Sequence, residues 1–212
     1  MILSAFNHLF ENASKVKVDT NSLTEQNRRF YEQIMKFEFK KETEFMNSVY
    51  TSTTQKLTFC HNDISAANIL LTIDENENAG KNLTVIDYEN CFFNYRGIDI
   101  GKFFAESMHE NNKEHSVYPG DEEIECLVRE YLKELQRISQ QFNEKIDNED
   151  TLTLEVHCGR LLTHIFTSLW NIVHPNFSDE KFKVFENTVL RMSMYKQLKE
   201  KFLIKYPQFN NC

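Results

Sequence analysis

The spacing of the apolar residues changes twice along this chain, and that change limits the folds open to it. Through residues 22–48, and again after Tyr95, apolar side chains recur three or four positions apart, which is the period of an amphipathic helix. Between these stretches lie LTFC, NILLTI and LTVIDY, short runs of apolar and β-branched residues separated by polar segments. Such runs are typical of short strands. The pattern predicts an α+β fold that is predominantly helical, with a small strand-and-loop insert.

The first helix and the strands have local signals of their own. Ser22 and Glu25 form an S-x-x-E capping box, so we expect one helix over residues 22–48. The last two strand runs flank a polar stretch that contains Gly80, and we expect them to pair as a hairpin.

The second half of the chain predicts helices only. One is expected from Ile100 onward, and a longer one behind Pro119, with apolar spacing that continues to Phe142. Another covers residues 151–173 and ends before a proline, and Ser178 is expected to cap the last.

These elements predict one domain over residues 1–212. It comprises a leading helical segment (1–56), the strand-and-loop insert (57–95) and a helical region (96–212). A chain of this length can bury a substantial core.

The charge and the cysteines exclude several classes of function. Lysine and arginine number 24 against 32 aspartates and glutamates, so the formal net charge is −8. An excess of carboxylates repels phosphate backbones, and nucleic acid is therefore not an expected partner. The apolar runs are too short for a membrane span. The five cysteines form no CxxC pair, which favours reduced thiols and a cytoplasmic location.

The polar residues that could act in catalysis or bind a metal gather at the ends of the expected strands. They are His61, Asn62, Asp63, Asn68, Asp87 and Glu89. Carboxylate and amide oxygens are the ligands that Mg²⁺ prefers. We expect Asn68 and Asp87 to converge on one such ion, with Asp63 beside it as a base for an attacking hydroxyl. The alternative is that HND is an ordinary turn whose side chains bond their own backbone.

Three segments carry a resemblance to a known family. HNDISAANILL, VIDYE and FFNYRGIDIGKFFAE resemble, in order and spacing, the choline/ethanolamine kinases, small-molecule kinases of the protein-kinase-like fold. The likeness continues through SLWNIV and covers most of residues 57–200. It implies the C-terminal lobe of that fold, with ATP as co-substrate and Mg²⁺ as cofactor. The implied reaction is phosphorylation of the hydroxyl of ethanolamine or choline, the first step of phosphatidylethanolamine or phosphatidylcholine synthesis.

The resemblance assigns the reaction centre residue by residue. Asp63 matches the catalytic aspartate, Asn68 and Asp87 match Mg²⁺ ligands, and Glu89 falls on the second acidic position of the metal segment. An aminoglycoside-type phosphotransferase shares this arrangement, but the NYRGIDIG string argues against it.

Three further residues have implied supporting roles. His61 would brace the catalytic loop, and Asp99 would hold that loop through backbone hydrogen bonds. Arg96 has two interpretations, a brace for nearby carboxylates or a phosphate contact, of which we favour the brace.

The implied head-group pocket is only partly present. Glu106 matches an acidic residue near the ammonium, and Trp170 matches one aromatic wall, although Glu106 could be a solvated helix residue and Trp170 a core residue. Asn90, Thr167 and Asn111 stand where the family has aromatic residues. Fewer aromatic walls weaken cation–π attraction to a trimethylated ammonium, so we expect ethanolamine rather than choline.

The start of the sequence departs from the family. The 56 residues before the first expected strand contain no glycine, and no G-x-G occurs anywhere, so we expect neither a glycine-rich phosphate loop nor an N-terminal lobe. Two functions remain open, an ATP-dependent kinase and a truncated, non-catalytic relative that binds or regulates. The expected partners are ATP and a small amino alcohol, together with a second copy of the chain or an intact kinase.

Overall fold

A computed structural model describes residues 2–72, 82–107, 119–174 and 183–212. The chain divides into two compact units. Thr54–Arg160 form the strand unit, and the helical unit is made of Met1–Thr53 with Leu161–Cys212. Each is described by itself.

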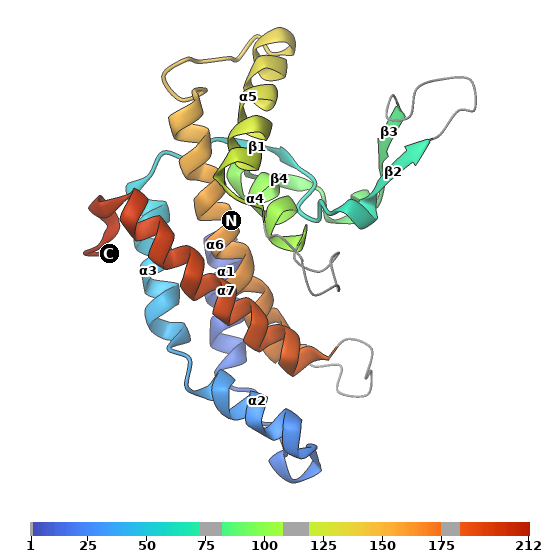
Figure 1. The fold of residues 1–212 in the computed structure, drawn as a ribbon, viewed down its shortest axis with the longest axis vertical. Coiled ribbons are helices and arrows are strands. Elements are labelled where there is room, and N and C mark those ends of the chain that lie inside the picture. Colours follow the sequence, from blue (N-terminus) through green and yellow to red (C-terminus); the bar gives the residue numbers. More distant parts are fainter. Residues whose placement is uncertain (1, 73–81, 108–118, 175–182) are drawn as a thin grey trace. The chain divides into compact units, whose positions relative to one another are not determined.

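The strand unit contains every strand of the described residues, in two antiparallel ribbons (Figure 1). The pairs are β1 (Leu57–Cys60) with β4 (Phe92–Tyr95), and β2 (Ile69–Thr72) with β3 (Asn82–Val85). The three predicted strands and the pairing of the last two are confirmed, while Gly80 lies outside the described residues. Strand β4 was not predicted. Its FFNY sequence has no clean alternation, and its pairing with β1 joins segments that are distant in sequence.

Helices α4 (Arg96–Glu106), α5 (Asp121–Ile138) and the first half of α6 (Glu149–Val173) complete this unit. They enclose an apolar core of Phe104, Ile124, Val128, Leu132, Leu152 and Val156. The prediction that α5 extends to Phe142 is wrong, because Ser139 is already extended (φ −103°, ψ 125°).

Glycines let α4 and α6 approach closely within the strand unit. A Cβ on Gly159 would lie 1.9 Å from the carbonyl oxygen of Gly97, and one on Gly97 would lie 2.3 Å from that of Glu155. Gly101 has the same constraint, 2.5 Å from the backbone nitrogen of Arg160. No side chain fits at these distances, so the crossing requires glycine on both helices.

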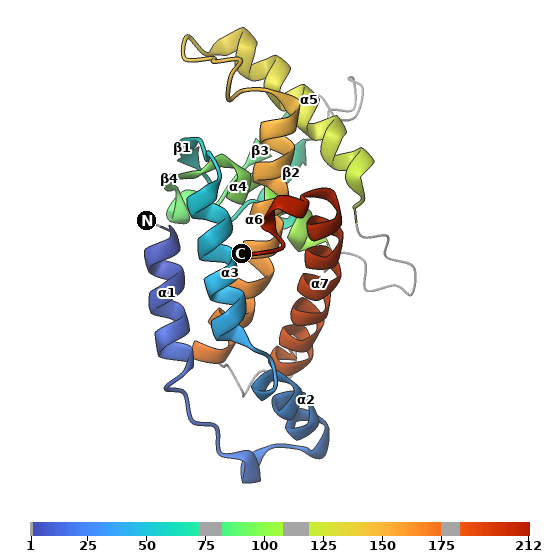
Figure 2. The ribbon, with the colours of Figure 1, turned by 90° about the vertical axis from the view of Figure 1, so that its left-hand side faces the viewer.

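The helical unit consists of α1 (Ile2–Ala13), α2 (Glu25–Met35), α3 (Phe39–Ser52), the second half of α6, and α7 (Val184–Lys205). Helix α1 packs on α3, and α2 packs on α7 (Figure 2). The predicted helix over residues 151–173 is confirmed as part of α6. Ser178, the predicted cap of the last helix, lies outside the described residues.

The prediction of one helix over residues 22–48 is wrong. The helical pattern breaks between Met35 and Phe39, where Phe37 is buried against the rings of Phe39 and Tyr195. The cap is also displaced, since Thr24 rather than Ser22 accepts the backbone N–H, that of Asn27, at 3.2 Å. Burial of Phe37 therefore overrides the continuous helical periodicity.

The strands of the strand unit leave apolar side chains in solvent. Phe59 is 64% exposed and Phe93, opposite it on β4, is 61% exposed, with their rings 5.8 Å apart. None of the helices in the described part of the chain is both long and apolar enough to cross a membrane.

Candidate active site

The loop that follows β1, residues 61–68, is anchored to the first turn of α4. The carboxylate of Asp99 accepts the backbone N–H groups of His61 and Asn62, each at 2.7 Å. A carboxylate in the first turn of a helix also interacts favourably with the helix dipole. Asp99 therefore positions the backbone of this loop, which we call the catalytic loop.

Both ring nitrogens of His61 are engaged. Nε2 lies 2.8 Å from the carbonyl oxygen of Ile86, and Nδ1 accepts the N–H of Asp63 at 3.2 Å. A carbonyl only accepts, so the neutral tautomer that satisfies both contacts carries its proton on Nε2. The buried ring thus connects the catalytic loop to the residue before Asp87.

Asn62 secures the turn by bonding nearby backbone, as the alternative interpretation of HND expects. Its backbone is left-handed (φ 62°), which asparagine adopts more readily than most residues. Its amide nitrogen donates to the carbonyls of Cys60 and Asn90, both at 3.1 Å, and its amide oxygen accepts from Asn94 Nδ2 at 2.7 Å. The buried Asn94 was not singled out from the sequence, although it begins the NYRGIDIG string.

Asp63 and Asn68 face each other across the catalytic loop. Asn68 Nδ2 donates to the backbone oxygen of Asp63 at 2.9 Å, so the amide oxygen of Asn68 is the atom left to bind a cation. The side chain of Asp63 is 37% exposed, and a substrate hydroxyl can reach its carboxylate.

Asp87 lies next to Asn68 along the β2–β3 ribbon. The N–H of Ile86 donates to the carbonyl of Asn68 at 3.0 Å, which places Asp87 just beyond the end of the ladder. Asp87 is left-handed (φ 67°), a strained conformation for a residue other than glycine that is often found at functional sites. Glu89 follows in an exposed single turn, Tyr88–Asn90.

This donor set suits Mg²⁺. Within the described ranges no group of three histidine, cysteine, aspartate or glutamate side chains could hold a metal by itself. Mg²⁺ bound to a nucleotide needs fewer protein ligands, because one or two carboxylates suffice and phosphate oxygens and water complete its coordination shell. Asp87, Glu89 and the amide oxygen of Asn68 match that chemistry.

A lysine that sequence reasoning missed pairs with Asp63. Lys102 Nζ on α4 lies 2.7 Å from Asp63 Oδ1. The available signal was its spacing, since Lys102 follows Asp99 by three positions and shares its face of the helix.

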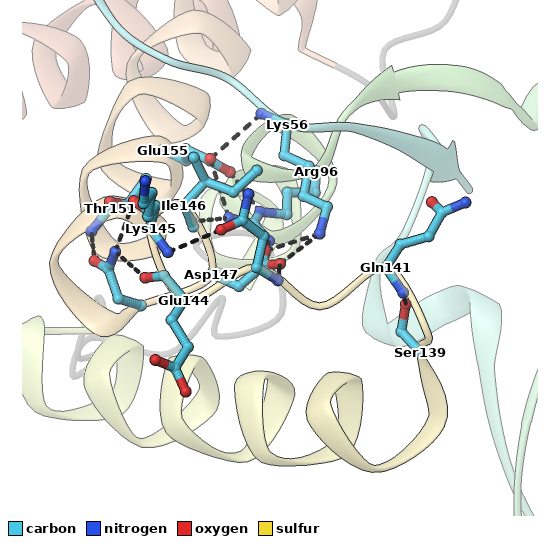
Figure 3. Close-up of polar contacts among 12 residues, drawn as sticks. Lys56, Arg96, Ser139, Gln141, Glu144, Lys145, Ile146, Asp147, Thr151 and Glu155 are labelled. Atoms are coloured by element: carbon cyan, nitrogen blue, oxygen red, sulfur yellow. Dashed lines mark hydrogen bonds and ion pairs between the residues drawn. The ribbon is translucent and has the colours of Figure 1, made fainter.

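Arg96 lies in a buried cluster of charges (Figure 3). Its guanidinium donates to Glu155 Oε2 at 2.7 Å and to the carbonyl of Ile146 at 2.9 Å, and it also pairs with Asp147. Lys56 Nζ lies 2.6 Å from Asp147 Oδ2. Arg96 thus contacts carboxylates within the core, the arrangement expected of a brace. Lys56, Asp147 and Glu155 were not identified from the sequence, because they come from separate segments.

The two carboxyl groups of this cluster titrate differently. Burial disfavours the charge of Asp147, but hydrogen bonds from Lys56, the N–H of Asn143 and Arg96 outweigh it and hold its pKa below the usual value. Burial dominates at Glu155 and raises its pKa in spite of Arg96. The cluster therefore favours the charged form of Asp147, whereas burial makes ionisation of Glu155 less favourable than that of an exposed glutamate.

The residues expected at the head group belong to different units. Glu106 is half-buried at the end of α4 in the strand unit. Trp170 belongs to the helical unit and is 49% exposed, so its interpretation as a core residue is wrong. Its indole ring lies between the rings of Phe166 and His174, with centroids 6.3 and 4.2 Å away.

Two of the three positions that depart from the family motif lie among the described residues, and neither is fully buried. Asn90 is exposed and Thr167 is half-buried, while Asn111 lies outside the described residues.

Comparison with known proteins identifies the family. A family model described as choline/ethanolamine kinase matches residues 1–196, including the leading segment for which the motifs gave no likeness. A human choline/ethanolamine kinase is 33% identical over 77% of this chain and 43% of its own length. Mouse ethanolamine kinase 1 is 29% identical over 86% of this chain and 50% of its own length. The chain thus spans about half the length of these curated relatives.

Solved structures agree with this assignment. A choline kinase from Cryptosporidium parvum superposes with a TM-score of 0.63 at 24% identity, over 96% of this chain and 57% of the other. An ethanolamine kinase from Plasmodium vivax gives a TM-score of 0.62 at 19% identity, over 90% and 46%. These two likenesses show the protein-kinase-like fold. Together with the family model and the human relative, they lead to one conclusion: the chain belongs to the choline/ethanolamine kinase family.

Proposed function

We propose that this chain carries the catalytic loop and cation-binding residues of an ATP-dependent kinase that phosphorylates the hydroxyl of ethanolamine or choline. The observation that carries the proposal is the anchoring of Asp63. Its loop is held by Asp99, by His61 and by Asn68, and Asp87 follows the residue to which His61 is bonded. The backbone N–H and the carbonyl of Asp63 are thus both bonded, which supports a fixed position for its partly exposed carboxylate.

In the reaction, the hydroxyl oxygen of the amino alcohol attacks the γ-phosphorus of ATP. The bond to the β-phosphate oxygen breaks, ADP leaves, and the hydroxyl proton passes to the carboxylate of Asp63. Mg²⁺, when bound by Asn68, Asp87 and Glu89, supplies positive charge to the phosphates. His61 and Asp99 keep the catalytic loop in place during the transfer.

The head-group residues favour ethanolamine. The carboxylate of Glu106 would attract an ammonium. A primary ammonium donates three hydrogen bonds and suits polar neighbours such as Asn90, whereas a trimethylated one needs aromatic walls. The product would be the phosphate ester that begins phosphatidylethanolamine synthesis, with the choline ester as the second product.

The test is Mg²⁺·ATP-dependent phosphorylation of ethanolamine and of choline by the purified 212-residue protein. Asp63→Ala should abolish turnover, whereas Asp150→Ala, at an exposed aspartate in the first turn of α6, should retain it. Equal turnover in both variants would contradict the role of Asp63.

A folded protein with no turnover would instead favour the second function, a non-catalytic relative that binds or regulates. Sedimentation of the protein alone, and mixed with an intact kinase of the family, would then test the homodimer and the pairing with an intact kinase.

A further inference from the structure

The ion pair between Lys102 and Asp63 differs from the other lysine pairs on the α4 and α5 helices. Lys133 and Glu130, for example, are three residues apart on one helix, lie 3.5 Å from each other, and are 76% and 68% exposed. Exposed ion pairs of that kind contribute little to the free energy of folding. Lys102 is only 23% exposed and reaches a residue of a different segment at 2.7 Å. The fold, rather than helical spacing, brings these two charges together.

The contact extends the attachment of the catalytic loop to α4. Asp99 binds the backbone at the start of the loop, and Lys102, three residues further along the same helix, binds the side chain of its catalytic aspartate. One helix face therefore determines the position of both the backbone and the carboxylate.

The loop itself offers no other cation for this purpose. Residues 61–68 and 86–90 include the acidic Asp63, Asp87 and Glu89 but contain no lysine or arginine. The ammonium of Lys102 supplies, from α4, the positive charge that these two segments lack.

We propose that Lys102 is a positioning residue for Asp63 in the phosphoryl transfer, an inference that rests on the proposed function. Its ammonium holds one side of the carboxylate, so that the group stays available to the substrate hydroxyl. Lys102 acts through Asp63 and not through the head group. Its loss should therefore lower kcat for every alcohol substrate and leave the KM values nearly unchanged.

The experiment compares Lys102→Met with Lys102→Arg, which keeps the charge, and with the matched control Lys133→Met. Misplacing a reacting group by about 1 Å costs on the order of 100-fold in rate. We therefore expect Lys102→Met to lower kcat about 10- to 100-fold for ethanolamine and choline alike, with KM for ATP within roughly threefold of the wild type. Lys102→Arg should recover part of the loss, and Lys133→Met should match the wild type.

A second readout does not depend on turnover. Acylation of lysines by acetic anhydride, followed by peptide mass spectrometry, measures how far each amine is shielded. Asp63→Asn should speed acylation of Lys102 and leave that of Lys133 unchanged. An unchanged rate at Lys102 would show that the ion pair does not form in solution and would overturn the proposal.

The kinetic outcomes separate this proposal from the proposed function. Turnover by wild type with Lys102→Met equally active would overturn the role of Lys102 alone. A loss confined to KM, or to one of the two alcohols, would place Lys102 at the substrate and also overturn it. Absence of turnover in folded wild-type protein would overturn both.

Discussion

At the scale of the residue, the site depends on side chains that use all their hydrogen-bonding capacity. Each ring nitrogen of His61 contacts a different segment, and the side chain of Asn62 bonds four residues from a left-handed turn. Such residues position the catalytic loop without taking part in the chemistry.

Replacing His61 by phenylalanine tests whether the hydrogen bonds of the imidazole ring hold the catalytic loop. The variant retains the ring packing but leaves the carbonyl of Ile86 and the N–H of Asp63 without their partner. We expect the free energy of unfolding to fall by about 1–3 kcal/mol, because two partly buried hydrogen bonds of about 0.5–1.5 kcal/mol each are lost. Urea unfolding measures the change, and turnover should fall with it. His8→Phe, on the exposed side of α1, is the control. Equal stability of the two variants would show that the ring does not link the segments.

If the proposed function holds, we expect single residues to set the preference between ethanolamine and choline as well. Asn90→Tyr adds an aromatic ring at an exposed position where the family has one. A cation–π contact of about 0.5–2 kcal/mol should raise kcat/KM for choline relative to ethanolamine, by a few-fold to about tenfold. Steady-state kinetics with both alcohols measures the ratio. A shift of the ratio toward ethanolamine would contradict the polar-pocket argument.

At the scale of the element, α4 is the part of the fold on which the site depends. Its first turn carries Arg96 and Asp99, Lys102 follows one turn later, and its glycines set its distance from α6. A shift of this helix would therefore move the brace, the backbone anchor and the partner of Asp63 together.

Gly159→Ala tests the crossing of α4 and α6. The new Cβ would lie 1.9 Å from the carbonyl oxygen of Gly97, so the helices must separate. Overpacking of this kind costs about 1–3 kcal/mol and sometimes more, and we expect at least that loss in urea unfolding. Gly120→Ala is the control, since its Cβ would meet only the side chain of Glu123 at 3.4 Å. If the two variants were equally stable, the close approach of α4 and α6 would not require glycine at position 159.

The buried charge cluster predicts a dependence on pH. The pKa of Asp147 is lower in the folded protein than its ordinary value of 3.8. Its stabilising contribution is therefore fully present above that value and is lost as the pH falls through the folded pKa. Asp147→Asn should cost about 3–5 kcal/mol at pH 7, since it leaves the buried cation of Arg96 short of a partner.

Unfolding free energies of wild type and Asp147→Asn, measured from pH 7 to pH 3, check this. The difference between the two proteins should be largest at pH 7 and should shrink below pH 4. Glu155 has its pKa raised chiefly by burial and also by the charge of Asp147, so its contribution acts in the opposite direction and its pKa should be lower in Asp147→Asn. A difference that stays constant down to pH 3 would exclude Asp147 as the source.

At the scale of the whole molecule, the structure divides into two compact units, whereas the sequence predicts one domain, and the two descriptions differ in the number of unfolding transitions expected. Helix α6 supplies residues to both units, Glu149–Arg160 to one and Leu161–Val173 to the other. If residues 1–212 form one domain, as the sequence predicts, calorimetry should show a single transition with equal calorimetric and van't Hoff enthalpies. Two separate transitions would contradict the single domain.

Much of the fold was accessible from the sequence, because helical periodicity, capping residues and β-branched runs act over a few positions. Those local signals predicted α5, α6 and the β2–β3 pairing, and the motif order indicated the family. They failed where a distant contact decides the local structure. The helix break at Phe37 depends on Tyr195, and β4 exists because β1 lies beside it.

The sequence by itself therefore determined the predominantly helical class, the family and the candidates Asp63, Asn68 and Asp87. Only the tertiary structure decided that Asp99 and Lys102 of α4 hold the loop of Asp63, and that Arg96 is buried with Asp147 and Glu155. The reason is physical. Residue type and short-range spacing report which groups can do chemistry, whereas ion pairs between distant segments depend on how the folded chain brings those segments together.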